Sequence, residues 1–313
     1  MRSAVASLAG ALTLLAVAHA QPAPSAPSPT AAAVPPSLLK LRATGVVTIA
    51  HRTDALPFSY LSADKQPIGY GIDVCNEIVR GLQRELRLPA LKVDYVPVTA
   101  ANRFQVLNAG QADVECGLTV NNIERRRDAE YSLPYYFAGP RILTRVNSGI
   151  SEFHHLRGRR VVAAKGANAV PILQKRIETQ QLMGTTLLLV DGNQQAFAAL
   201  EKGDADAWVT TDNLLFAFRA TAPNPTDYHV VGSALVVEPV AIVMRKGDVE
   251  FKAAVDRVLS GLMIDGVVGR LYDKWFLKPV PVPARNELRV VGIPMSALLR
   301  DQLRWPSDRA GDQ

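Results

Sequence analysis

Arg125 stands where a cation could bind the carboxylate of a ligand. It follows residues 112–118, which are short and apolar enough to form a strand buried on both faces, and the polar turn Asn121-Asn122. Ligands of open α/β sheets bind beyond the carboxyl ends of the strands, and a guanidinium there can hold a carboxylate by two parallel hydrogen bonds. The alternative is a solvated helix start, because Arg125 begins a run of three arginines.

No constellation typical of catalysis accompanies this cation. The sequence has no Gly-x-Ser-x-Gly motif, no phosphate-binding loop and no His/Glu pair at metal-binding spacing. The five histidines are scattered apart from His154-His155, and two cysteines are too few for a metal cluster. We therefore expect a binding function, with no catalytic residue, no metal and no cofactor.

The elements that position Arg125 are encoded twice. Leu107-x-x-Gly110-x-Ala112-Asp113 matches Leu200-x-x-Gly203-x-Ala205-Asp206. In each copy Gly is the C-cap of a helix, and a strand and a polar turn follow. We expect two similar βα lobes that face each other across a cleft, with both aspartates in structural roles.

Strands alternate with helices along the chain, which predicts an α/β fold with mainly parallel sheets. The expected strands are 46–50, 91–97, 112–118, 158–164, 186–190, 207–210 and 238–245. The expected helices begin at 72 or 73 and near 169, and cover 194–202, 249–262, 268–275 and 296–303.

The N-terminus is typical of an exported protein. Residues 1–20 have Arg2, an apolar run at 8–18 that is short for a bilayer, and a small-x-small cleavage site, as in a cleaved secretory signal peptide. Residues 21–37 are rich in Pro, Ala and Ser, which predicts a disordered tether. The expected location is the periplasm.

Cys75 and Cys116 are the only cysteines. In an oxidising compartment an even pair can be bridged. One is expected on a helix and the other on a strand, where the Cα spacing often exceeds the limit of ~7 Å. Two small buried hydrophobes are the favoured interpretation, and the bridge is left open.

The net charge of +6 and the pI of about 9.4 come from basic residues scattered along the chain. They are not interleaved with aromatics as on a nucleic-acid surface, so no nucleic-acid partner is expected. A basic field could still attract an anionic solute.

Several phrases together resemble family 3 of the periplasmic solute-binding proteins, which serve ABC importers of polar amino acids. The resemblance is strongest to the glutamate/aspartate-binding branch and covers about 38–306. The phrases are His51-Arg52, Pro57-Phe58-Ser59-Tyr60, Asn102-Arg103, Glu115-Cys116-Gly117, Asn121-Asn122-Ile123-Glu124-Arg125 and Tyr272-Asp273-Lys274-Trp275-Phe276.

The resemblance implies a type II periplasmic-binding-protein fold, with two mainly parallel sheets joined by two hinge strands. Lobe one would be 38–137 plus 239–313, and lobe two 138–238. The protein would be a monomer that captures an acidic amino acid by lobe closure and delivers it to a membrane permease.

The resemblance also implies the binding residues. Arg125 would hold the α-carboxylate of the ligand, and Arg52 and Arg103 its second carboxylate. Phe58 would place a ring against the ligand, although a core position is an equal alternative. Ala167 belongs to a loop before a helix whose free N–H groups suit an anion.

The sequence departs from the family where the ligand's ammonium would bind. Leu118 and Val120 stand where the family has a small residue and a hydroxyl residue. Thr211 stands where the family has an aspartate, and the nearest aspartate, Asp212, is the next residue along the chain. Asn193 replaces a histidine. These departures suggest a ligand with two carboxylates whose amino group is weakly recognised or absent.

Three other functions remain open. A receptor for a non-amino dicarboxylate is the first. A periplasmic cyclohexadienyl or arogenate dehydratase on the same fold is the second, with Glu238 or Asp212 as the general acid. A sensory domain that feeds a membrane kinase is the third, and it would need a separate partner.

Overall fold

The computed structural model describes residues 36–282 and 286–308. The predicted signal peptide (1–20) lies outside these residues, as does the predicted tether (21–37) except for its last two residues. Within the described ranges, no helix has both the length and the hydrophobicity needed to cross a bilayer.

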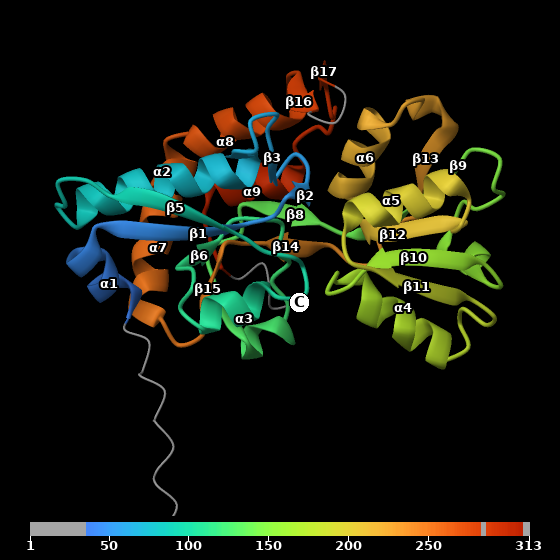
Figure 1. Cartoon of the computed structure of the whole chain (residues 1–313), viewed down its shortest axis with the longest axis horizontal. Helices are drawn as coiled ribbons and strands as arrows, with labels where there is room; N and C mark the ends of the chain where they lie inside the picture. Colours follow the sequence, from blue (N-terminus) through green and yellow to red (C-terminus); the bar gives the residue numbers. More distant parts are fainter. Residues whose placement is uncertain (1–35, 283–285, 309–313) are drawn as a thin grey trace, which may run out of the picture. The chain divides into compact units, whose positions relative to one another are not determined.

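Two five-stranded sheets form the framework (Figure 1). The first has the order β5 (Lys92–Pro97), β1 (Val46–His51), β6 (Val114–Glu115), β15 (Val243–Arg245) and β7 (Ala129–Tyr131). The second has the order β11 (Thr186–Val190), β10 (Arg160–Ala164), β12 (Ala207–Thr211), β9 (Pro140–Arg145) and β13 (Tyr228–Val231). In each sheet the first three strands are parallel, and β15 or β9 runs antiparallel to both its neighbours. The predicted α/β class with two mainly parallel sheets is confirmed.

The chain passes from one sheet to the other twice. β8 (Tyr136–Ala138) and β14 (Glu238–Val240) pair antiparallel, and both lie between the two sheets in Figure 1. They are the two hinge strands of a two-lobed fold; the first lobe contains the β1 sheet and the second lobe the β10 sheet. The exact division at 137/138 and 238/239 stays a proposal.

Helices cover both faces of each sheet. They are α1 (Ser37–Thr44), α2 (Tyr70–Glu85), α3 (Arg103–Asn108), α4 (Ala169–Glu178), α5 (Asn193–Lys202), α6 (Asp212–Thr221), α7 (Val249–Ile264), α8 (Val267–Tyr272) and α9 (Ala297–Arg304). The remaining elements are β2 (Asp54–Ala55), β3 (Ser59–Leu61), β4 (Pro67–Ile68), β16 (Val280–Val282), β17 (Glu287–Arg289), η1 (Arg125–Arg127), η2 (Phe153–Leu156), η3 (Pro225–Asp227) and η4 (Asp273–Leu277).

The second sheet illustrates how the sequence fills both layers. Successive strand residues point to opposite faces. Val161 therefore packs with Leu173 of α4 in one core cluster, whereas Val162 packs with Phe197 of α5 and Phe218 of α6 in another. Both faces being buried explains the near-continuous apolar runs in these strands.

Three predicted boundaries were wrong. The strand expected at 112–118 is only β6, because the Glu115 carboxylate accepts hydrogen bonds from the Gly117 N–H and the Thr119 hydroxyl and turns the chain off the sheet. The single strand expected at 238–245 divides into β14 and β15, because the first part joins the hinge and the second the first sheet. The helix expected at 268–275 is α8 followed by η4.

Cys75 of α2 and Cys116 form a disulfide, with their Cα atoms 6.2 Å apart. The favoured interpretation of two unbridged hydrophobes was therefore wrong. α2 packs closely enough on the end of β6 to satisfy the spacing limit, which the sequence could not reveal.

The repeated aspartates have the structural roles that were predicted. Asp113 accepts a hydrogen bond from the Thr48 N–H at 2.8 Å, and Asp206 accepts one from the Arg160 N–H at the same distance. Asp113 immediately precedes β6 and binds a backbone N–H of the neighbouring strand β1. Asp206 immediately precedes β12 and likewise binds a backbone N–H of the neighbouring strand β10. Asp113 also pairs with Lys40, and Asp206 with the Arg160 guanidinium.

Candidate functional site

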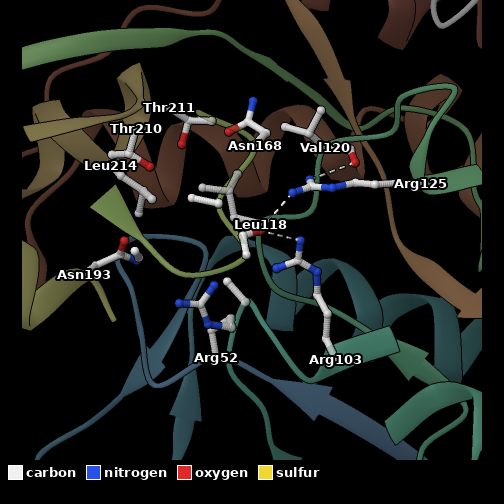
Figure 2. A pocket seen from close by; sticks show the side chains of 14 residues that line it. Arg52, Arg103, Leu118, Val120, Arg125, Asn168, Asn193, Thr210, Thr211 and Leu214 are labelled. Atoms are coloured by element: carbon white, nitrogen blue, oxygen red, sulfur yellow. Dashed lines mark hydrogen bonds between the residues drawn. The ribbon is translucent and has the colours of Figure 1, made fainter. Parts of the chain in front are cut away.

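A small pocket lies where the carboxyl ends of the parallel strands of both sheets meet (Figure 2). This is the position at which open α/β sheets bind their ligands. Its cavity is about 30 Å³, roughly the space of one or two waters. The lining residues are Arg52, Ala100, Arg103, Leu118, Val120, Arg125, Ala164, Gly166, Ala167, Asn168, Asn193, Thr210, Thr211 and Leu214.

Arg52 follows β1 directly and is 5% exposed. Its N–H donates to the Ser59 hydroxyl at 2.9 Å, and that hydroxyl donates to the Arg52 carbonyl, so the backbone is fixed from both sides. Its guanidinium donates to the Asp54 carboxylate at 2.6 Å. One of the pocket's cations is thus already paired.

Arg103 and Arg125 converge on one backbone oxygen of the other lobe. Arg103 opens α3 and is 2% exposed, and its guanidinium approaches the Gly166 carbonyl at 3.5 Å. Arg125 opens η1 and donates to the same carbonyl at 2.9 Å and to the Val120 carbonyl at 3.3 Å. Among the residues that the structure describes, neither guanidinium has a carboxylate partner.

The electrostatics of this cluster favour an anion. Burial lowers the pKa of Arg103 to about 9, and the neighbouring Arg125 and Arg52 add to the effect by repulsion while Glu115 opposes it. Burial also lowers the pKa of Arg125. In addition, within the described chain the buried Nε atoms of Arg52 and Arg103 have no hydrogen-bond partner. A bound carboxylate would offset the desolvation of these guanidiniums and supply the missing acceptors.

The structure brings eight of the ten predicted site residues into the pocket. Besides the three arginines, these are Leu118, Val120, Ala167, Asn193 and Thr211. In Figure 2 the arginines lie on one side, and Asn193, Thr210, Thr211 and Leu214 lie across from them. The Thr211 hydroxyl is buried and has no partner in the described residues.

Phe58 and Asp212 do not line the pocket. Phe58 is fully buried, and its ring packs edge-on against Tyr70, Tyr136 and Phe276 with centroids 5.5, 4.9 and 5.5 Å away, as expected for a core position. The Asp212 carboxylate accepts hydrogen bonds from the backbone N–H groups of Gly139 and Asn213, which turns it toward the hinge.

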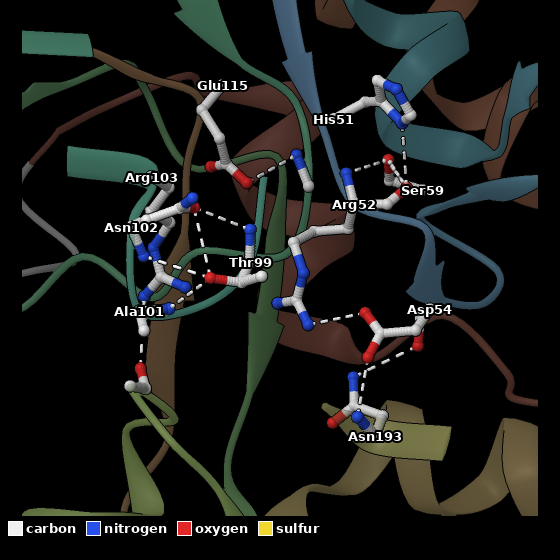
Figure 3. A network of polar contacts seen from close by, with 12 residues as sticks. His51, Arg52, Asp54, Ser59, Thr99, Ala101, Asn102, Arg103, Glu115 and Asn193 are labelled. Atoms are coloured by element: carbon white, nitrogen blue, oxygen red, sulfur yellow. Dashed lines mark hydrogen bonds and ion pairs between the residues drawn. The ribbon is translucent and has the colours of Figure 1, made fainter. Parts of the chain in front are cut away.

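Sequence reasoning missed Asp54. Its carboxylate accepts a hydrogen bond from the backbone N–H of Asn193 at 2.6 Å while it pairs with Arg52, and the Asn193 amide donates to the Asp54 carbonyl at 3.1 Å (Figure 3). Asp54 thereby links the first lobe to the amino end of α5. Only its spacing of two from Arg52 could have suggested the ion pair.

Glu238 makes another contact between the lobes. Its two carboxylate oxygens accept hydrogen bonds from the side-chain amides of Asn122 and Asn168, at 3.2 and 2.6 Å. Neither Glu238 nor Asp212, the two candidate general acids, faces the pocket. No group of acidic, His or Cys side chains suited to a metal ion occurs in the described ranges.

Comparisons with known proteins agree with this architecture. The family of bacterial extracellular solute-binding proteins, family 3, matches residues 47–278. The L-glutamate/L-aspartate-binding protein of Pseudomonas aeruginosa is 34% identical over 278 residues, which cover 88% of this chain and 90% of the relative. The glutamate/aspartate import solute-binding protein of Escherichia coli is 32% identical over 274 residues, with 88% and 89% covered.

Solved structures extend the likeness to three dimensions. An ancestral arginine-binding protein bound to glutamine has a TM-score of 0.67 and 25% identity, over 75% of this chain and 99% of that one. An ancestral amino acid-binding protein, described as a precursor of cyclohexadienyl dehydratase, has a TM-score of 0.64 and 26% identity, over 77% and 99%.

Proposed function

This chain belongs to family 3 of the bacterial extracellular solute-binding proteins, and on that premise we propose that it captures a small solute with two carboxylates for an ABC importer. Glutamate and aspartate are the first candidates, because two relatives with more than 30% identity carry those names. The solute would then be delivered to a membrane permease.

The observation that carries this proposal is the convergence of Arg52, Arg103 and Arg125 on one small pocket. Guanidiniums bind carboxylates through paired charge-assisted hydrogen bonds. Because Arg52 already pairs with Asp54, Arg103 and Arg125 are the two that can each take a carboxylate of the ligand.

Binding couples to lobe closure through Gly166. A cavity of about 30 Å³ does not admit a solute of nine or ten heavy atoms, so the lobes must separate for entry. Arg103 and Arg125 would exchange the Gly166 carbonyl for the ligand and close on it from the first lobe. The ligand shifts the equilibrium between the open and closed lobes because it binds the closed form more tightly than the open form.

The same site is proposed to be non-enzymatic. A dehydratase needs a general acid within reach of its substrate, and among the described residues no acidic side chain lines the pocket. Because one structural neighbour is a precursor of such an enzyme, prephenate should be incubated with the purified protein. Its turnover would favour the dehydratase. We further propose a periplasmic monomer.

Titration calorimetry on ligand-stripped protein tests the proposal. We expect at least one small dicarboxylate to bind, and Arg125→Ala to weaken that binding more than about 100-fold, since truncating a buried charge partner costs about 3 kcal/mol or more. Arg127→Ala, an exposed neighbour on the same turn, is the matched control. If no dicarboxylate binds, or if Arg125→Ala binds normally, the proposal fails.

A further inference from the structure

Four buried or half-buried carboxylates near the pocket are engaged by other protein groups. Asp54 pairs with Arg52 and with the Asn193 N–H. Glu115 accepts from Gly117 and Thr119, Glu238 from Asn122 and Asn168, and Asp212 from Gly139 and Asn213. None of the four lines the pocket, whose described lining contains no Asp or Glu.

An ammonium group on the ligand would therefore find no counter-ion in the described lining of the pocket. The lining side chains that are not arginine are neutral, and several are apolar, including Leu118, Val120 and Leu214. The ammonium would instead stand near two guanidiniums whose pKa is already lowered, that of Arg103 by burial and by repulsion from Arg125 and Arg52, and that of Arg125 by burial. A buried cation without a partner is strongly disfavoured.

The Thr211 hydroxyl fits a neutral oxygen better than a cation. It is buried on the side of the pocket opposite the arginines and has no partner in the described chain (Figure 2). A hydroxyl can donate to a keto oxygen or accept from a hydroxyl group. A carbonyl or hydroxyl on the ligand's second carbon would satisfy Thr211 without adding charge.

We propose that the pocket selects a four- or five-carbon dicarboxylate dianion that lacks an amino group, such as a 2-oxo or 2-hydroxy diacid. This inference rests on the proposed function, because it uses the same arginines for the two carboxylates. It differs in predicting that the acidic amino acids are the poorer ligands.

Titration of ligand-stripped protein with 2-oxoglutarate and glutamate provides the test, since the two share a carbon skeleton and differ only at the second carbon. Succinate, malate and aspartate form the four-carbon set. We expect 2-oxoglutarate to bind at least tenfold more tightly than glutamate. Malate and succinate should likewise each bind at least tenfold more tightly than aspartate. Equal or tighter binding of glutamate and aspartate would overturn this inference and leave the proposed function standing. Binding of none of the five would overturn both.

The variant Thr211→Asp tests whether the lack of a counter-ion for the ammonium group causes the preference for amino-free ligands. A carboxylate at this position would supply the missing counter-ion, so glutamate should bind at least tenfold more tightly than to wild type and 2-oxoglutarate more weakly. Thr211→Asn is the matched neutral control, and it should gain no glutamate affinity. A folded Thr211→Asp protein with unchanged preference would overturn the role assigned to the missing counter-ion. If that variant does not fold, the wild-type pair of ligands still decides the ligand class.

Discussion

The Asp54 carboxylate of the first lobe accepts a hydrogen bond from the backbone N–H of Asn193 in the second, at 2.6 Å. Asn193 is the first residue of α5, so the carboxylate sits at the positive end of a ten-residue helix. The same carboxylate neutralises Arg52 in the pocket. One side chain thus joins the ligand site to the contact between the lobes.

Replacing Asp54 should loosen the closed form. Asp54→Asn keeps the size of the side chain but removes the charge, and hydrogen bonds to charged groups contribute about 1.5–3 kcal/mol. We expect the bound solute to dissociate about tenfold faster in stopped-flow measurements. Asp191→Asn is the control, because Asp191 pairs only with exposed Lys165 in the described chain. A dissociation rate within twofold of wild type would contradict the role of Asp54.

Gly166 should be intolerant of a side chain because the other lobe lies against it. A Cβ there would lie 2.4 Å from the Ala100 carbonyl oxygen. Gly158 has nearly the same backbone conformation, with φ of +69° against +74°, but a Cβ would meet no atom within 4 Å.

These two glycines form a matched pair. Both Gly→Ala changes should cost roughly 1–2 kcal/mol of stability for the left-handed conformation. Only Gly166→Ala should also weaken ligand binding, by about tenfold or more, because it keeps the lobes from closing. Calorimetric titration and thermal melts of the two variants separate the effects. Equal affinities would show that this contact does not limit closure.

The disulfide should contribute substantially to stability. It closes a loop with a sequence separation of 41, for which chain entropy predicts about 4 kcal/mol. We expect a reductant, or the double change Cys75→Ala and Cys116→Ala, to lower the free energy of unfolding by a comparable amount in urea titrations. The double variant should not respond to reductant. Identical midpoints for oxidised and reduced wild type would refute the contribution.

His51 should make the fold sensitive to acid. Burial lowers the pKa of its imidazole below the usual 6.5, against a smaller opposing effect of its hydrogen bond to the Arg52 carbonyl. Below pH 6.5 the unfolded chain therefore binds a proton that the folded chain resists, so stability is complete above pH 6.5 and falls as the pH decreases.

The size of this effect is limited to about 1.4 kcal/mol per pH unit for one group. His51→Asn removes the titration, so its free energy of unfolding should depend less on pH between 6.5 and 5 than that of wild type. Denaturant titrations at several pH values measure the difference. Parallel pH profiles would assign the acid sensitivity to other groups.

Local patterns were sufficient for most of the architecture. The apolar runs of β1, β10 and β11 and the repeated Leu-x-x-Gly-x-Ala-Asp phrase predicted the two parallel sheets, because burial and capping act on neighbouring residues. The position of Arg125 after a strand likewise predicted a place in the site. Phe58 could not be assigned between core and pocket, since an aromatic ring suits both.

The sequence by itself determined the α/β class, the duplicated lobe unit and the cationic character of the site. Only the tertiary structure decided which carboxylates remain available to a ligand. Asp54, Glu238 and Asp212 each accept a hydrogen bond from a residue at least 70 positions away, namely Asn193, Asn168 and Gly139, so these contacts arise from packing between distant segments. The strength of such contacts depends on distance and burial, which no local pattern records.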